Sequence, residues 1–172
     1  MIDGERRSGR FSECQPRTGE ETYMVSTIGY ERANLDDFIA TLMLGGIEVL
    51  VDIRDRAQSR RPGFSKTALA EALHDAGIRY VHMRELGDPK EGREAARSGD
   101  FERFEFIFQS VLDSDTGKKA FRDLEELVIK QTVCLMCYER DQNTCHRKIV
   151  SDKLEKSLKI KATHLGVRDG VS

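Results

Sequence analysis

Short apolar runs alternate with segments of helical periodicity along most of the chain. Five such runs have the length and composition of strands, and the segments between them repeat their apolar residues every three or four positions. The runs are Met24–Ile28, Ile47–Ile53, Ile78–His82, Thr132–Tyr138 and Ile160–His164. Strands that alternate with helices pair in parallel through right-handed crossovers. The sequence therefore predicts a single three-layer α/β domain, with a mostly parallel sheet of about five strands flanked by helices.

Capping residues and glycines mark the expected helices. Asn34 is expected to cap a helix that stops at Gly45, and Ser65 to cap one that stops at Gly77. Residues 86–99 are polar and contain glycine, so we expect a loop with partial helix there. Helical spacing recurs in three further segments, 101–112, Ala120–Lys130 and Cys145–Leu158.

The composition is that of a soluble globular protein. The chain has 172 residues, of which 38% are hydrophobic and 34% are charged. It has no apolar run of about 20 residues and no signal-peptide pattern, so we expect no membrane association and a cytoplasmic location. Residues 1–22 are rich in charge and glycine, which indicates a disordered extension ahead of a domain spanning 23–172. The net charge of −2 means that phosphate or nucleic-acid binding would need a local basic patch.

Polar and reactive side chains recur where the expected strands end. Ligands of open parallel sheets bind outside the carboxyl ends of the strands. Tyr30 follows the first run, Asp52 lies near the end of the second, and Glu139 follows the fourth. His82 and His164 end two other runs. Asp52 and Glu139 are the natural candidates for general acid or base, although each could instead orient a neighbouring arginine.

The loop after the second run is strongly basic. Residues 54–66 carry five cations against one anion and lead into a helix N-terminus, where free backbone N–H groups favour anions. This predicts an anion-binding pocket for a phosphate-bearing small molecule, a nucleotide or a nucleic acid, while a solvated charged loop is the alternative. The expected ligand-binding residues are Tyr30, Arg54, Ser59, Arg60, Arg61 and Arg147.

A cluster of thiols and one imidazole lies between the fourth run and the last helix. Cys145 is expected at a helix N-terminus beside His146, an environment that favours a thiolate, so redox or covalent chemistry at Cys137 or Cys145 is one interpretation. A zinc site formed by Cys134, Cys137, Cys145 and His146 is another. Residues three apart in a strand point to opposite faces, so Cys134 and Cys137 should diverge, and the metal site is not favoured.

Several landmarks together resemble one family, the domain of unknown function family 488 (DUF488). They are Thr27-Ile28-Gly29, Asp52-Ile53-Arg54, Ser59-Arg60-Arg61, Phe64-Ser65, Leu86-Gly87, Cys137-Tyr138-Glu139 and Cys145-His146-Arg147. The resemblance covers Tyr23 to His164 and implies a compact α/β domain of bacterial or archaeal origin, with no established reaction. Members often have His-Ser where this chain has Tyr30-Glu31, and Gly-Gly where it has Gly87-Asp88.

Three functions follow from these residues. The leading one is an anion-binding domain that can catalyse phosphoester or nucleotide chemistry, with Glu139 or His146 moving protons. The second is thiol chemistry at Cys137 or Cys145, and the third is a metal-stabilised binding module. The sequence leaves open whether the domain is an enzyme.

Overall fold

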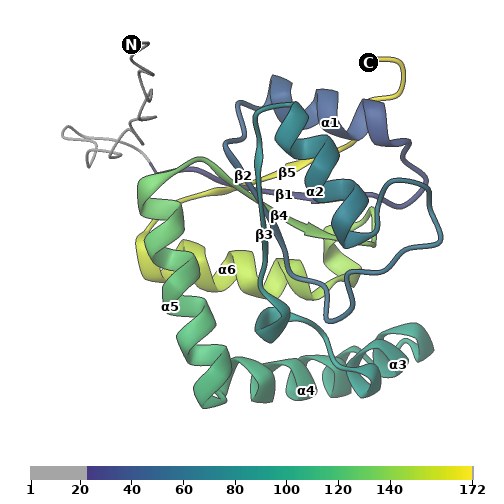
Figure 1. Ribbon diagram of the computed structural model, residues 1–172. Coiled ribbons are helices and arrows are strands. Elements are labelled where there is room, and N and C mark those ends of the chain that lie inside the picture. The colour runs from purple at the N-terminus through teal and green to yellow at the C-terminus, as the bar shows by residue number, and fades with distance from the viewer. Residues whose placement is uncertain (1–22, 172) are drawn as a thin grey trace, which may run out of the picture.

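A parallel sheet of five strands runs through the centre of the structure, a computed structural model that describes residues 23–171 (Figure 1). Its strand order is β3-β2-β4-β1-β5. The strands are β1 Val25–Gly29, β2 Val49–Asp52, β3 Arg79–His82, β4 Val133–Cys137 and β5 Ala162–Leu165. Each strand coincides with one of the five apolar runs, so the predicted parallel α/β architecture is confirmed.

Helices cover both faces of the sheet (Figure 1). One face packs against α1, Leu35–Leu44, and α2, Lys66–Asp75. The other packs against α5, Asp115–Lys130, and α6, His146–Leu158, and α4, Phe101–Asp113, packs against α5 and adds to the same core layer. The short helix α3, Lys90–Ser98, lies beside α4, and two 3-10 turns, Arg84–Leu86 and Gln142–Thr144, complete the connections.

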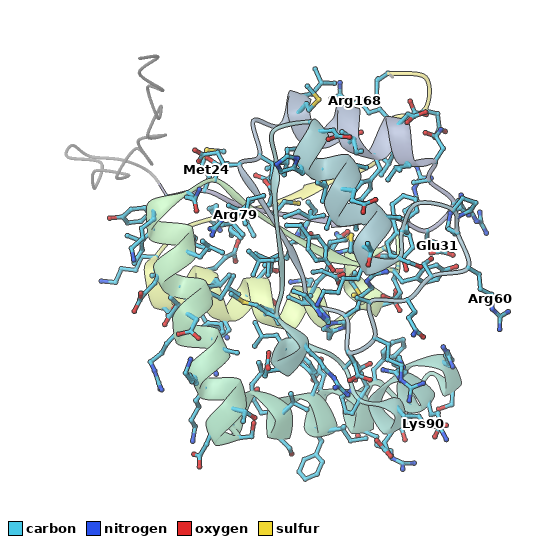
Figure 2. All side chains as sticks on the ribbon, viewed as in Figure 1. Met24, Glu31, Arg60, Arg79, Lys90 and Arg168 are labelled. Atoms are coloured by element: carbon cyan, nitrogen blue, oxygen red, sulfur yellow. The ribbon has the colours of Figure 1, made fainter. Side chains whose placement is uncertain are left out.

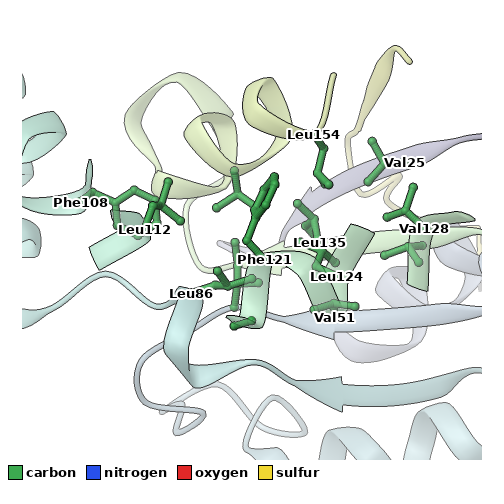
Figure 3. Packing of buried hydrophobic residues seen from close by; sticks show 14 of the residues in the cluster. Val25, Val51, Leu86, Phe108, Leu112, Phe121, Leu124, Val128, Leu135 and Leu154 are labelled. Carbon is green, nitrogen blue, oxygen red and sulfur yellow. The ribbon is translucent and has the colours of Figure 1, made fainter. Parts of the chain in front are cut away.

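The strand alternation divides the core into two layers. Val51 and Leu135 point to the layer that contains Leu124 and Phe121 of α5 (Figure 3). Cys134 points the other way, into the layer under α1 and α2. Because successive side chains in a strand alternate between faces, neighbouring residues of β4 serve different cores.

The connections leave the central strands in opposite directions. β4 lies between β1 and β2, whose chains continue into α1 and α2 on one face, whereas β4 continues into α6 on the other. A crevice forms at the carboxyl edge of a sheet where adjacent connections diverge in this way. Gly29 pairs with Cys137 in the register, so the ends of β1 and β4 meet at this point.

The structure differs from the expectation between the third strand and α4. Residues 90–98, expected as a loop with partial helix, form the complete helix α3. Gly92 lies within this helix, and a Cβ at this position would stand only 2.0 Å from Asp88 Oδ1, so the glycine leaves room for the Asp88 side chain. Helix α5 begins at Asp115, five residues before the expected start, with the Ser114 hydroxyl capping Gly117 N–H. The extension expected at residues 1–22 lies outside the described residues.

Within residues 23–171, no helix is long and apolar enough to cross a membrane.

Gly29 permits a close approach that no other residue would allow. A Cβ at this position would stand 1.8 Å from the Glu139 carbonyl oxygen. Gly29→Ala must therefore shift the backbone after β4, and we expect a loss of about 2 kcal/mol or more in the free energy of unfolding, measured by urea denaturation. Gly166→Ala is the control, because its Cβ would meet nothing within 4 Å, and we expect a change within about 0.5 kcal/mol. Equal effects in the two variants would contradict this account.

Candidate functional site

A buried ion pair stands at the end of β2. The Asp52 carboxylate accepts hydrogen bonds from Arg54 Nε at 2.8 Å and from Arg54 Nη2 at 2.6 Å. Its second oxygen also accepts a bond from the Tyr80 hydroxyl at 2.6 Å, and the first accepts one from the Arg54 backbone N–H. Although burial works against the charge of the guanidinium, the adjacent carboxylate raises the pKa of Arg54. The Asp52 carboxylate is therefore bound by Arg54, which is the orienting arrangement that the sequence left open beside an acid–base role.

Arg54 also holds the residue after β1. Its Nη1 donates to the Tyr30 hydroxyl at 2.9 Å and to the Phe64 carbonyl at 3.0 Å. The Tyr30 and Phe64 rings stack with centroids 4.5 Å apart. Arg54 therefore fixes the start of the basic loop against the carboxyl edge, and most of its hydrogen-bonding capacity is used within the protein.

A thiol, an imidazole and a carboxyl group meet at the end of β4. Cys137 Sγ lies 2.9 Å from Glu139 Oε2 and 3.7 Å from His146 Nδ1. Cys145 Sγ lies 3.8 Å from the same Nδ1. The other ring nitrogen of His146 is 2.8 Å from the Ile53 carbonyl and donates to it, so Nδ1 faces the two sulfurs. Four of the five residues expected to be catalytic are therefore brought together.

The charges in this cluster act on one another. Burial would raise the pKa of Cys137, but hydrogen bonding from Cys145 and the positive charge of His146 hold it well below its usual range. Burial lowers the pKa of His146, and the Cys137 thiolate more than offsets this and brings it to about 9. Burial and the neighbouring thiolate raise the pKa of Glu139 to about 7, and burial also raises that of Cys145. The arrangement favours a Cys137 thiolate beside a His146 imidazolium.

Arg147 is positioned to hold the loop that carries Glu139. Its side chain is fully buried, and it donates to the carbonyls of Glu139 and Arg140. Cys145 caps α6, and its sulfur accepts from the Arg147 backbone N–H at 3.5 Å. Arg147 was expected to bind a ligand, but in the structure it lies behind the cluster and shapes the backbone.

A cavity of about 560 Å³ opens from this cluster. Its wall carries Cys137, Glu139 and His146 at one end and many guanidinium groups around it. The lining residues are Tyr30, Arg54, Asp55, Arg56, Gln58, Ser59, Arg60, Arg61, Asp88, Arg93, Arg97, Cys137, Tyr138, Glu139 and His146. All the expected ligand-binding residues except Arg147 are on this wall.

The arginines around the cavity differ in how they are used. Arg61 donates to the Ala33 carbonyl, and Arg93 donates to the Asp88 carbonyl. Among the residues that the structure describes, Arg56, Arg60 and Arg97 make no side-chain hydrogen bond or ion pair. Arg60 extends away from the ribbon of the basic loop (Figure 2). These three guanidiniums are available to an anion.

Asp88 is a buried carboxyl group on the same wall. Its Oδ1 has no hydrogen-bond partner within the described part of the chain, although the side chain is only 6% exposed. Burial raises the pKa of Asp88 to about 6, against the opposing charges of His146 and Arg93. Sequence reasoning missed Asp88, Arg93 and Arg97, because they lie in a segment expected to be mostly loop. The Gly87-Asp88 departure from the family pattern was the available signal.

The remaining candidates lie outside the cluster. Cys134 is fully buried in the layer under α1 and α2, where burial raises its pKa, so the four-residue zinc set is not assembled. His82 lines a second cavity of about 580 Å³, together with Arg84 and residues at the start of α2. His164 pairs with Thr27 at 2.8 Å on the edge strand β5.

The fold and the site define a class, namely a parallel α/β domain with a buried thiol–imidazole–carboxyl cluster where the central connections diverge. The comparison with protein families agrees with the resemblance seen in the sequence. The family described as "Domain of unknown function DUF488" matches residues 34–154, and the chain belongs to it. No curated protein and no solved structure matches the chain.

Removing the charge of Asp52 tests its structural role. Asp52→Asn leaves the buried Arg54 guanidinium without its counter-charge, and we expect a loss of about 3 kcal/mol or more in the free energy of unfolding by urea denaturation. The control is Asp55→Asn, because Asp55 is partly exposed and its contacts with Arg84 and Arg93 are 3.3 and 3.4 Å. That variant should lose less than about 1 kcal/mol. A mild effect at Asp52 would argue that the ion pair does not anchor this edge.

The lowered pKa of Cys137 predicts how it reacts. An ordinary thiol has a pKa near 8.5, so its alkylation rate rises roughly tenfold per pH unit below that value. Because the pKa of Cys137 is lowered well below that value, its alkylation rate should level off at a lower pH than that of an ordinary thiol. Iodoacetamide labelling with peptide mass spectrometry measures each cysteine, and the buried Cys134 is the internal control. A Cys137 rate that rises with pH like that of a free thiol would show that its pKa is not lowered.

Proposed function

We propose that the domain hydrolyses phosphate esters of small molecules, with Cys137 as the nucleophile. One observation carries the proposal: Cys137 Sγ, within 4 Å of both a carboxyl oxygen and an imidazole nitrogen, lies on the wall of an arginine-lined cavity. A nucleophile is activated when a base is within hydrogen-bond reach and a third group orients that base. His146 stands next to the thiol, and the Ile53 carbonyl orients its ring.

The cavity supports a phosphate-bearing substrate of limited size. A volume of about 560 Å³ falls in the range of small-molecule pockets. Arg56, Arg60 and Arg97 have no partners among the described residues, and a planar guanidinium matches two phosphate oxygens. Tyr138 lines the same wall and is 44% exposed, so it offers an aromatic surface to the rest of the substrate.

The chemistry balances with the groups present. The Cys137 thiolate attacks phosphorus, the S–P bond forms, and the P–O bond to the leaving alcohol breaks as Glu139 gives its proton to the departing oxygen. Water then attacks the phosphocysteine, Glu139 takes the proton of that water, and the S–P bond breaks to release phosphate and the thiolate. Glu139 is the carboxyl group beside the sulfur, with its oxygen 2.9 Å from Cys137 Sγ, and its pKa of about 7 lets it give and take a proton near neutral pH. His146 stabilises the thiolate at the start and end of the cycle.

Phosphate release from a panel of small phosphomonoesters, in buffer with a chelator, tests the proposal. Cys137→Ser should lower the rate by about 10³-fold or more, because the hydroxyl is a far weaker nucleophile at neutral pH. Cys134→Ala is the matched control, because this thiol lies in the opposite core layer, and it should keep the wild-type rate. Acid quenching during turnover should leave one phosphoryl group on the peptide that contains Cys137.

Two results would overturn the proposal. One is phosphate release that persists in Cys137→Ser, which would place the nucleophile elsewhere. The other is no release above the Cys137→Ser background on any substrate, with the wild-type protein shown to be folded. Arg60→Gln separates binding from chemistry: it should raise KM several-fold and leave kcat close to that of the wild type, because Arg60 contacts no group of the cluster.

A further inference from the structure

We propose that Cys137, Cys145 and His146 form a binding site for one zinc ion, which shuts off the thiol when it is bound. The two sulfurs and His146 Nδ1 all lie within 4.8 Å of one another, and all three residues are buried. Thiolate and imidazole are the ligands that zinc prefers in proteins. The proposal concerns binding and regulation, and it does not depend on the hydrolysis proposed above.

The distance of each sulfur from the imidazole nitrogen fits a tetrahedral ion. With Zn–S bonds of about 2.3 Å and a Zn–N bond of about 2.0–2.1 Å, sulfur and nitrogen stand about 3.6 Å apart. The two S···N distances in the structure are 3.7 and 3.8 Å. Each sulfur therefore already stands at the distance from the imidazole nitrogen that a shared metal ion requires.

The surroundings of the ligands are already ordered. His146 donates from its other ring nitrogen to the Ile53 carbonyl, and such a bond is the usual support of a metal-binding histidine. The Phe108 ring packs against the imidazole, with centroids 5.1 Å apart. The N–H of Arg147 points to Cys145 Sγ and stabilises the thiolate that a metal requires.

A fourth donor is at hand, and it is not the one that the C-x2-C spacing indicates. Cys134 points into the core layer under α1 and α2, away from the three ligands. Glu139 Oε2 lies 2.9 Å from Cys137 Sγ, so a carboxylate oxygen is the nearest further ligand. Cys137, Glu139 and His146 line the cavity, which gives the ion a path of entry.

Bound zinc and a nucleophilic Cys137 exclude each other. The ion would occupy a lone pair of the Cys137 sulfur, so zinc should protect Cys137 from alkylation. A site of this kind makes the reactivity of Cys137 depend on the concentration of free zinc. The chelator in the hydrolysis assay removes zinc and with it this effect.

Cobalt titration of the full chain tests the site directly. The Cys14→Ser background removes the thiol that lies outside the described residues. We expect one Co²⁺ per chain, with a thiolate charge-transfer band and tetrahedral d–d bands, and we expect zinc to displace it. Cys145→Ser should weaken zinc binding by about 100-fold or more, because losing a ligand costs more than losing a supporting hydrogen bond. Cys134→Ala is the control and should bind as the background protein does.

X-ray absorption of the zinc-loaded background protein keeps the test independent of any variant that fails to fold. Two sulfur ligands and one imidazole at about 2.3 and 2.0–2.1 Å would support the site. A zinc coordination shell of nitrogen and oxygen only would overturn the site. So would a cobalt titration without a stoichiometric charge-transfer band, or one in which the band is lost in Cys134→Ala and kept in Cys145→Ser. The metal-binding experiments contain no phosphate ester, so their outcome is independent of the hydrolysis assay. Metal binding by a protein without phosphatase activity would refute the proposed hydrolase alone. Phosphatase activity in a protein that binds no metal would refute the zinc site alone.

Discussion

The Arg54 guanidinium is the interaction on which the carboxyl edge of the sheet depends. It pairs with Asp52 at the end of β2, and the same carboxylate binds Tyr80 of β3. Its other nitrogen reaches Tyr30 after β1 and the Phe64 carbonyl before α2. A buried charge of this kind is costly unless every donor is satisfied, so the four segments must assemble together or leave the charge unpaired. The basic loop is therefore held to the carboxyl edge at Arg54 and Phe64, and the arginines between them line the cavity.

The opposite wall of the cavity is formed by the end of β4 and the start of α6, and contacts with the backbone hold the loop between these two elements in place. Arg147 holds the loop between them by its carbonyls, and Gly29 lets that loop pass close to β1. The cluster of Cys137, Glu139 and His146 is thus placed by the end of β4, which contributes to both core layers, and by α6, which packs in the layer with α5, while Phe64 of the basic loop packs in the layer under α1 and α2. Cys137 and the arginines of the basic loop meet because the connections of neighbouring parallel strands leave the sheet on opposite sides.

Periodicity predicted all five strands, because the apolar runs end at turn residues and the helices begin at capping residues. The divergence of Cys134 from Cys137 also followed from the strand period alone, and the structure confirms it. The role of Asp52 could not be settled in this way, because Tyr80, its second partner, is 28 residues away and enters only through strand pairing. Asp88 was missed because α3, which begins two residues after it, has no large apolar side chain to mark a buried segment, and only the folded chain shows which carboxyl groups lose water.

The position of β1 in the sheet has a consequence for how the chain acquires its structure during synthesis. Both neighbours of β1 in the sheet, β4 and β5, come late in the chain. More than a hundred residues must therefore be synthesised after β1 before it can pair with another strand. Until then only β2 and β3 can form a ladder. Non-local parallel pairing of this type is slow, and an unpaired apolar strand is prone to self-association. A nascent chain cut short before residue 133 would expose β1 and β2 without the strand that joins them, which makes the incomplete protein a natural substrate for chaperones and proteases.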